Sequence, residues 1–88
     1  MKWTIDYTNP AKKQLKSLDK PIRERIINFV KKLSELENPY SIGASLTGGL
    51  TGYWKYRVGD YRLLCEINNE KLLVLVVKVG HRREVYKT

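Results

Sequence analysis

The segment YWKYRVGDYRLLCEI, residues 53–67, has the pattern of two strands joined by a tight turn, and it is the most informative part of the sequence for the fold. Apolar and polar residues alternate on either side of Gly59-Asp60, which is the period of half-buried strands. Glycine at the first central position suits the two-residue type II′ turn that closes many hairpins. The sequence therefore predicts strands over 53–58 and 61–67, with a hairpin loop at Gly59-Asp60.

A two-residue loop also sets the register between the two strands. Counting back from the loop gives three cross-strand pairs: Val58 with Tyr61, Arg57 with Arg62, and Lys55 with Leu64. Because side chains alternate between the two sides of a strand, these pairs divide the hairpin into two faces. We expect one face to carry Tyr53, Lys55, Arg57 and Arg62. We expect the other face to pack against helices through Trp54, Tyr56, Val58, Tyr61, Leu63 and Cys65.

Upstream of the hairpin, the chain predicts a strand followed by two helices. Residues 2–7 alternate between apolar and polar side chains, as a strand does. Thr8-Asn9-Pro10 then starts a short helix, whose Leu15 and Leu18 are spaced to face inward. A longer helix is expected over about residues 19–36. Its apolar stripe contains Ile22, Ile26, Val30 and Leu33, with Ile27 and Phe29 beside them.

The rest of the chain predicts a loop and one further strand. Residues 40–52 contain four glycines and are expected to form a loop, without the Gly-Lys-Ser/Thr ending of a phosphate-binding loop. Leu72 to Val79 is a branched apolar run, expected to pair on both sides at the sheet centre and to end at Gly80. The fold class is therefore α+β: two N-terminal helices packed on a small, mainly antiparallel sheet, in the order β-α-α-β-β-β.

Length, charge and cysteine content narrow the function. The 88 residues make a single domain, 1–88, with a formal charge of +8. This charge favours nucleic acid, an anionic membrane surface or an acidic protein as partner, although a merely solvated basic surface has the same composition. One cysteine, Cys65, cannot form an internal disulfide, so nothing calls for an oxidising compartment. Asp6 interrupts the apolar run of a signal peptide, and the longest apolar stretch is too short for a membrane span. We expect a cytoplasmic protein.

The predicted register places Arg57 directly opposite Arg62, with Lys55 one step along the strand. Like charges in this position destabilise a sheet unless an anion lies between them. Arginine groups match phosphate oxygens in pairs, so a bridging phosphodiester suits this site, whereas the alternative is a solvated face that tolerates the repulsion. The C-terminal segment Gly80–Tyr86 should lie across the sheet nearby. It adds His81, Arg82, Arg83 and Tyr86.

These residue types suit cleavage of RNA without a metal ion. The sequence holds one histidine, no cluster of His, Cys and carboxylates that would bind zinc, and no close pair of acids. RNA carries its own nucleophile, the 2′-hydroxyl, so cleavage needs only a base, an acid and stabilisation of charge. Arginines can hold the phosphate as it gains negative charge, and a tyrosine can stack on a base or orient the attacking sugar.

Three segments carry a resemblance to a known family. They are Leu46–Gly48, Gly52–Leu63 and Val79–Tyr86. Together with the leading strand and the helix pair, they resemble the RelE branch of the RelE/ParE toxin superfamily over nearly the whole chain. The Gly-Asp-Tyr-Arg hairpin is shared across that superfamily, whereas the ending Gly-His-Arg-Arg-Glu-Val-Tyr is similar to the RelE branch.

The resemblance implies a toxin of a type II toxin–antitoxin system that acts as an mRNA interferase. Such a toxin cleaves message in the decoding site of the ribosome, without cofactor or metal, by attack of the 2′-hydroxyl, and so inhibits translation. The implied partners are an acidic, RelB-like antitoxin and the ribosome with bound message, and no membrane is involved.

Roles are carried over by position. Lys55 matches a family lysine proposed for base or charge stabilisation, and Arg62 matches the phosphate-holding arginine of the hairpin. Arg82 matches the arginine that assists the leaving group, and Tyr86 matches the tyrosine that stacks on and orients the substrate.

One position departs from the family pattern. Arg57 stands where the pattern has a second lysine, and a guanidinium is a poor proton acceptor. The identity of the base is therefore open, and His81 is the alternative to Lys55. Arg57 and Arg83 are expected to bind the RNA backbone together with Lys55 and Arg62.

Two other functions are compatible with the same fold. One is a ParE-like protein that inhibits DNA gyrase by binding, and the other is an inactive relative that acts only with its antitoxin in an operator-binding repressor complex. Fold does not separate these functions, because function depends on the site. The clustered cations and the tyrosine favour RNA cleavage.

Overall fold

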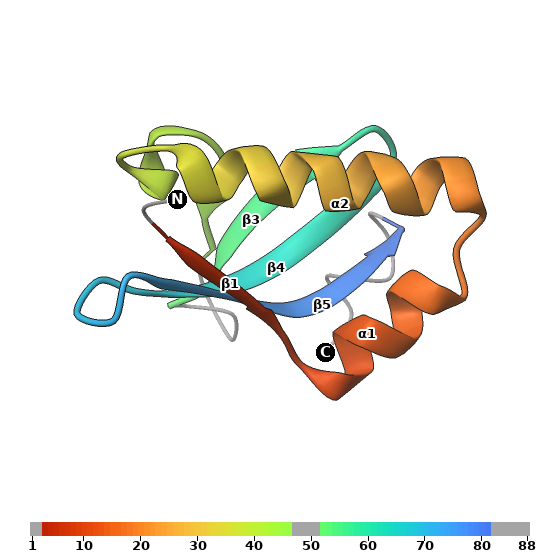
Figure 1. Ribbon diagram of the computed structural model, residues 1–88, viewed down its shortest axis with the longest axis horizontal. Helices are drawn as coiled ribbons and strands as arrows, with labels where there is room; N and C mark the ends of the chain where they lie inside the picture. The colour runs from red at the N-terminus through yellow and green to blue at the C-terminus, as the bar shows by residue number, and fades with distance from the viewer. Residues whose placement is uncertain (1–2, 47–51, 82–88) are drawn as a thin grey trace.

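A five-stranded mixed sheet, covered on one side by two helices, forms the computed structural model, which describes residues 3–46 and 52–81 (Figure 1). The sheet has the order β1-β5-β4-β3-β2. β1 runs parallel to β5, and the other neighbours are antiparallel. The strands are β1 (Thr4–Tyr7), β2 (Ala44–Ser45), β3 (Trp54–Val58), β4 (Tyr61–Asn68) and β5 (Leu73–His81). The helices are α1 (Asn9–Lys16) and α2 (Lys20–Glu35). The predicted α+β class is confirmed.

The β3–β4 hairpin has the predicted turn and register. Val58 pairs with Tyr61, Arg57 with Arg62, and Lys55 with Leu64. Gly59 has a φ of 60°, and among the described non-glycine residues only Leu72 has a positive φ. A positive φ at the first central residue alone is the signature of the type II′ turn.

Thr8 joins the start of α1 to the sheet. Its Oγ1 accepts a hydrogen bond from the Ala11 N–H at 3.2 Å, which is the predicted capping interaction. The same hydroxyl donates to the carbonyl of Val77 in β5 at 2.7 Å. Further along α1, the Gln14 side chain accepts the Val79 N–H at 2.7 Å. Within residues 3–46 and 52–81, no helix is long and apolar enough to cross a membrane.

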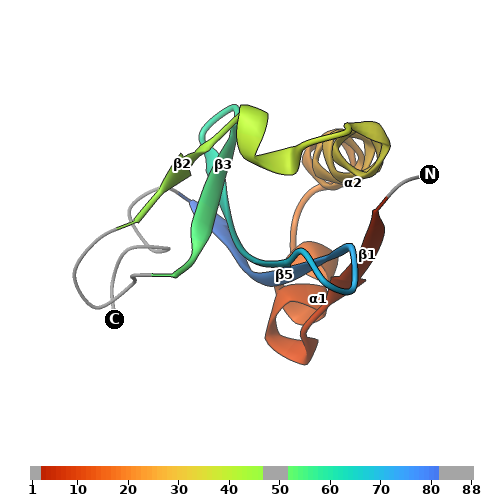
Figure 2. The ribbon, with the colours of Figure 1, turned by 90° about the vertical axis from the view of Figure 1, so that its left-hand side faces the viewer.

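The core lies between the helices and one side of the sheet (Figure 2). Leu15, Ile26, Val30 and Leu33 are buried as predicted, and Leu18, Ile22 and Phe29 pack against them. The prediction that Ile27 belongs to the buried stripe is wrong, because this residue is 44% exposed. It follows Ile26 by one residue, and the helical rotation turns it away from the buried stripe. The sheet contributes Tyr56, Leu63, Cys65, Val74, Val76 and Val79 to the core, and Trp3, which precedes β1, is buried with them.

Three predictions about the second half of the chain were wrong in detail. Residues 40–52 are not all loop, because a 3₁₀ turn forms over Pro39–Ser41 and β2 pairs with β3. β5 does pair on both sides, but β4 is the central strand. β5 also continues through Gly80, which pairs with Arg62, because β4 provides pairing partners as far as Tyr61.

Candidate nucleic-acid interface

Arg57 and Arg62 form the centre of the candidate site. Val58 and Tyr61 close the two-residue loop, so they are a hydrogen-bonded pair, and the next pair, Arg57–Arg62, is a non-hydrogen-bonded one. In such pairs the Cα atoms are about 4.5 Å apart and the side chains approach most closely. Both arginines lie on the side of the sheet away from the helices, since the alternate residue Tyr56 is buried in the core.

The two arginines line a small pocket together with Lys55, which we call the basic pocket. The pocket has a volume of about 210 Å³ and is lined by Gly43, Ala44, Lys55, Arg57 and Arg62. Arg57 is exposed, whereas Arg62 and Lys55 are half-buried. Three cationic side chains therefore surround a space whose remaining wall carries only a glycine and an alanine. The convergence of the hairpin cations predicted from the sequence is observed.

The polar contacts of the arginines do not neutralise their charge. The Arg57 Nε donates to the Gly59 carbonyl at 3.2 Å, and the Arg62 Nη1 lies 3.4 Å from the Tyr61 carbonyl. In the part of the chain that the structure describes, neither guanidinium contacts a carboxylate. Two opposed like charges favour an anion between them, and guanidinium groups bind phosphate through paired hydrogen bonds.

His81 lies on the other side of the sheet from the arginine pair. It pairs with Tyr61, and the two ring centroids are 5.8 Å apart in an edge-on arrangement. Directly paired residues share a face, and Tyr61 packs against the core on the helix side. The described structure therefore does not bring His81 into the pocket. Arg82, Arg83 and Tyr86 lie outside the described residues, so their predicted positions stay predictions.

Sequence reasoning missed three residues on this side of the sheet. Gly43 and Ala44 line the pocket because β2 pairs with β3, and two strand residues leave no periodic signal. Lys78 pairs with Leu64 and is half-buried, so it shares the face of Lys55. The sequence feature that could have indicated Lys78 is a single lysine inside the apolar run of β5.

The buried groups with altered acidity point into the core. Burial raises the pKa of the Cys65 thiol to about 12, so the thiol is neutral at physiological pH. Burial also raises the pKa of the Tyr56 phenol, with smaller effects from Cys65 and Tyr40. Both groups lie on the helix side of the sheet, and neither is available as a nucleophile or base for a ligand in the basic pocket.

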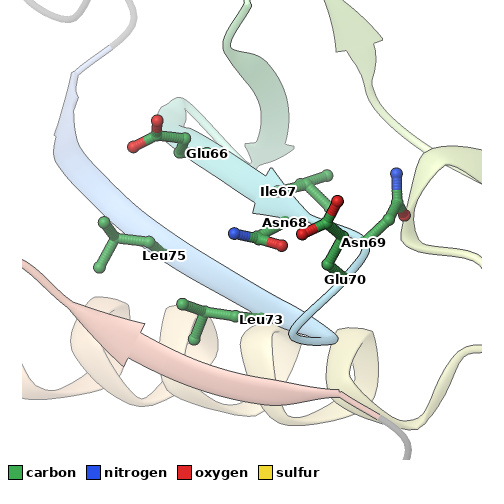
Figure 3. Close-up of a pocket in the computed structure, with 7 residues that line it drawn as sticks. All are labelled: Glu66, Ile67, Asn68, Asn69, Glu70, Leu73 and Leu75. Atoms are coloured by element: carbon green, nitrogen blue, oxygen red, sulfur yellow. The ribbon is translucent and has the colours of Figure 1, made fainter.

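A larger pocket of about 660 Å³, which we call the acidic pocket, lies at the β4–β5 end of the sheet (Figure 3). Its lining consists of Glu66, Ile67, Asn68, Asn69, Glu70, Leu73 and Leu75. The register pairs Glu66 with Leu75 and Asn68 with Leu73, so these side chains share one face. The carboxylates of Glu66 and Glu70 repel a phosphate. Size therefore does not identify the candidate nucleic-acid site, and the lining charge favours the smaller pocket as that candidate.

Comparisons with known proteins show the family of this chain. Residues 5–86 match the family model described as the ParE toxin of the type II toxin–antitoxin system parDE. The chain is 31% identical over 88 residues to Toxin RelG of Mycobacterium tuberculosis, with 99% of each chain covered. It is also 31% identical over 90 residues to the mRNA interferase toxin RelE of Escherichia coli, covering 98% of this chain and 92% of that protein.

A solved structure shows the same fold. A chain in the crystal structure of the toxin–antitoxin complex RelBE2 from M. tuberculosis matches with a TM-score of 0.84 and 31% identity. The match covers 93% of this chain and 100% of that chain. Fold and relatives together define a toxin of a type II toxin–antitoxin system. The chain belongs to the RelE branch of the RelE/ParE toxin family, as its resemblance predicted.

Proposed function

We propose that this toxin is a ribosome-dependent, metal-independent endoribonuclease that cleaves message by attack of the 2′-hydroxyl and so inhibits translation. The observation that carries the proposal is the meeting of Lys55, Arg57 and Arg62 around one pocket. The mRNA interferase named among its relatives supports the same activity. The chain would act in the cytoplasm on message held in the decoding site.

In this mechanism the arginines hold the scissile phosphodiester. A base removes the proton of the 2′-hydroxyl, the O2′–P bond forms, and the P–O5′ bond breaks as an acid protonates the 5′ oxygen. Arg57 and Arg62 stabilise the negative charge that accumulates on the phosphate oxygens. Lys55 lines the same pocket and is the base or a further source of positive charge.

The remaining roles come from the family resemblance. Arg82 would assist the leaving group, Tyr86 would stack on and orient the substrate, and Arg83 would contact the RNA backbone. His81 is the alternative base, and it would have to reach the substrate from the edge of the sheet. No cofactor is required, because the nucleophile belongs to the RNA.

Two partners follow from this proposal. The ribosome would present the message, and an acidic, RelB-like antitoxin would neutralise the toxin. Similar solved structures are toxin–antitoxin complexes, which supports an antitoxin for this chain as well. A formal charge of +8 suits an acidic antitoxin.

The deciding experiment is to express the toxin alone and map the 5′ ends of cellular messages. We expect new ends within translated frames and, with purified protein, cleavage only when ribosomes are present. The Arg62→Ala, Arg82→Ala double variant should lose both cleavage and growth arrest. The matched control is Lys31→Ala, Lys32→Ala, which removes two exposed charges from α2, and it should keep both. Full toxicity and cleavage in the arginine variant would show that the site is wrong.

A ParE-like inhibitor of DNA gyrase is the second candidate, because the matching family model is described as a ParE toxin. The same expression experiment separates the two functions. DNA-damage signalling with intact messages would support inhibition of gyrase and reject the endoribonuclease.

A further inference from the structure

The two sides of β3 contact different parts of the protein. Lys55 and Arg57 line the basic pocket, whereas the alternate residues Trp54 and Tyr56 contact residues 39–45, the segment that leads into β2 and includes it. The Trp54 Nε1 donates to the Ile42 carbonyl at 2.7 Å. The Tyr56 hydroxyl donates to the Pro39 carbonyl at 2.6 Å, and this hydrogen bond is buried. We call residues 39–45 the wall segment.

Gly43 lets the wall segment lie flat against β3. Its φ is 78°, a conformation that favours glycine. A Cβ on Gly43 would lie 2.4 Å from the Lys55 carbonyl oxygen and 2.7 Å from the Trp54 Nε1. Any other residue at 43 would therefore push the wall segment away from the strand that carries Lys55.

Ala44 follows directly and faces the pocket. It pairs with Lys55 across the β2–β3 ladder, so the two side chains share a face. Its methyl group is small, and with Gly43 it leaves the space of about 210 Å³ beside the three cations. Trp54 and Tyr56 contact this wall from the opposite side of β3.

We infer that the wall segment forms the side of a phosphate-binding pocket that faces the three cations. Trp54 and Tyr56 are positioning residues that hold this wall against Lys55. The proposed function supplies only the identity of the natural ligand, a phosphodiester of RNA. The wall and its two hydrogen bonds are features of the fold, so they can be tested with inorganic phosphate alone.

The surroundings of Trp54 and Tyr56 suit a fixed wall. The Tyr40 ring packs edge-on against Trp54, with centroids 4.9 Å apart. Phe29 of α2 packs against Tyr56 with ring centroids 5.7 Å apart, so the residue that contacts the wall is itself packed in the core. The Tyr56 phenol is protonated at physiological pH, and burial raises its pKa further above the ordinary 10.0, so it remains a hydrogen-bond donor to Pro39.

The first test is a titration of the folded protein with inorganic phosphate, followed by the backbone amide signals in NMR spectra. In the wild type, we expect Ala44 to shift together with Lys55 and Arg62, with one common Kd. Trp54→Phe and Tyr56→Phe each keep an aromatic ring and lose one hydrogen bond to the wall. Each should raise the Kd by roughly twofold to tenfold, the factor expected for the loss of one hydrogen bond.

Matched controls separate the wall from a general loss of packing. Trp3 also donates its indole N–H to a backbone carbonyl, that of Glu37 at 3.3 Å, but it lies beside β1 at the far edge of the sheet. Trp3→Phe should therefore leave the phosphate Kd unchanged. Ala44→Glu, which places a carboxylate beside Lys55, should raise the Kd by at least about tenfold. Ser45→Glu adds the same charge on the other face of β2 and should have a smaller effect.

The second test compares KM and kcat for cleavage of ribosome-bound message. A displaced wall weakens substrate binding, so Trp54→Phe and Tyr56→Phe should raise KM by the factor seen with phosphate and leave kcat within about twofold. A purely structural defect would lower the fraction of folded protein, which reduces the apparent kcat and leaves KM unchanged.

Two results would overturn the inference. Phosphate could shift Arg57 and Arg62 without any shift at Ala44, or both aromatic variants could bind phosphate as tightly as the wild type does. If the phosphate results hold but the wild type cleaves no message, the proposed function fails while the assignment of the wall stands.

Discussion

The hairpin end and the β4–β5 end of the sheet carry opposite charge on the same side. β4 contributes to both, because Arg62 lines the basic pocket and Glu66, four residues later, lines the acidic one (Figure 3). Leu64 lies between them on this side and is only 4% exposed. Neighbouring pockets on one strand can therefore have opposite preferences for ligands, and the sign of the lining charge matters more than the volume.

This difference in charge also indicates over which end of the sheet an RNA strand would approach. The basic pocket attracts the phosphate backbone, whereas Glu66 and Glu70 repel it from the opposite end of the sheet. A polyanion is thus expected to approach over the β3–β4 hairpin and not over the β4–β5 turn.

Removal of both arginines should have the largest effect. Arg57→Ala, Arg62→Ala deletes the two groups that would stabilise charge on the phosphate, so cleavage should fall by about 10³-fold. The measurement is single-turnover cleavage of ribosome-bound message. The matched change at the acidic end, Glu66→Gln with Glu70→Gln, should leave the rate within about twofold. Equal losses in the two double variants would remove the functional distinction between the two ends.

The residue between the two ends should matter for stability. Leu64→Ala removes a buried side chain and should lower the free energy of unfolding by about 3 kcal/mol. Leu73→Ala truncates a half-buried side chain in the acidic pocket, so it should lower the free energy of unfolding by less than Leu64→Ala does. Denaturant unfolding monitored by circular dichroism measures both changes. A Leu73 variant as destabilised as the Leu64 variant would place a second buried cluster at the acidic end.

Cys65 follows Leu64 but points into the core, so its ionisation should affect stability and not cleavage. Its pKa is raised from 9.0 to about 12 by burial. Above pH 9 the unfolded chain loses the thiol proton while the folded chain retains it, so the thiol's contribution is complete below pH 9 and is lost as pH rises toward 12. The expected slope is about 1.4 kcal/mol per pH unit. The free energy of unfolding of Cys65→Ala should fall less steeply between pH 9 and 11, measured by urea unfolding.

The smallest expected effect is a gain in stability at the basic end. Arg57→Thr removes the like-charge pair with Arg62 and should raise the free energy of unfolding by about 0.2–1 kcal/mol while weakening phosphate binding. Saturating inorganic phosphate should reduce this difference, because it stabilises the wild type more than the variant. Thermal unfolding with and without phosphate is the measurement. A variant less stable than the wild type in the absence of phosphate would mean that the arginine pair does not strain the sheet.

The local parts of the fold were predictable because they depend on near neighbours in the chain. Gly59-Asp60 determines the turn, the turn determines the register, and alternation then assigns Arg57 and Arg62 to one face. Thr8 starts α1 through a bond to Ala11, three residues away. Each of these features follows from a few consecutive residues and a known backbone geometry.

The parts that were missed depend on distant residues. Ala44 lines the pocket because it pairs with Lys55, and the segment before it accepts hydrogen bonds from Trp54 and Tyr56 that span 12 and 17 residues. His81 was expected beside the arginines, but pairing with Tyr61 places it on the other side of the sheet. Its face depends on the β4–β5 register, which shifts between Leu64 and Cys65. A one-residue irregularity of this kind reverses which side of the sheet a residue occupies.

The α+β class, the hairpin register and the pair of opposed arginines can be derived from the sequence alone, because these depend on periodicity and on one turn. Three features required the three-dimensional structure: β2 closes the basic pocket, Lys78 lies on the same side of the sheet, and Glu66 lines a separate acidic pocket. The physical reason is that a pocket is formed by segments far apart in the chain, and their contacts leave no periodic signal in the sequence.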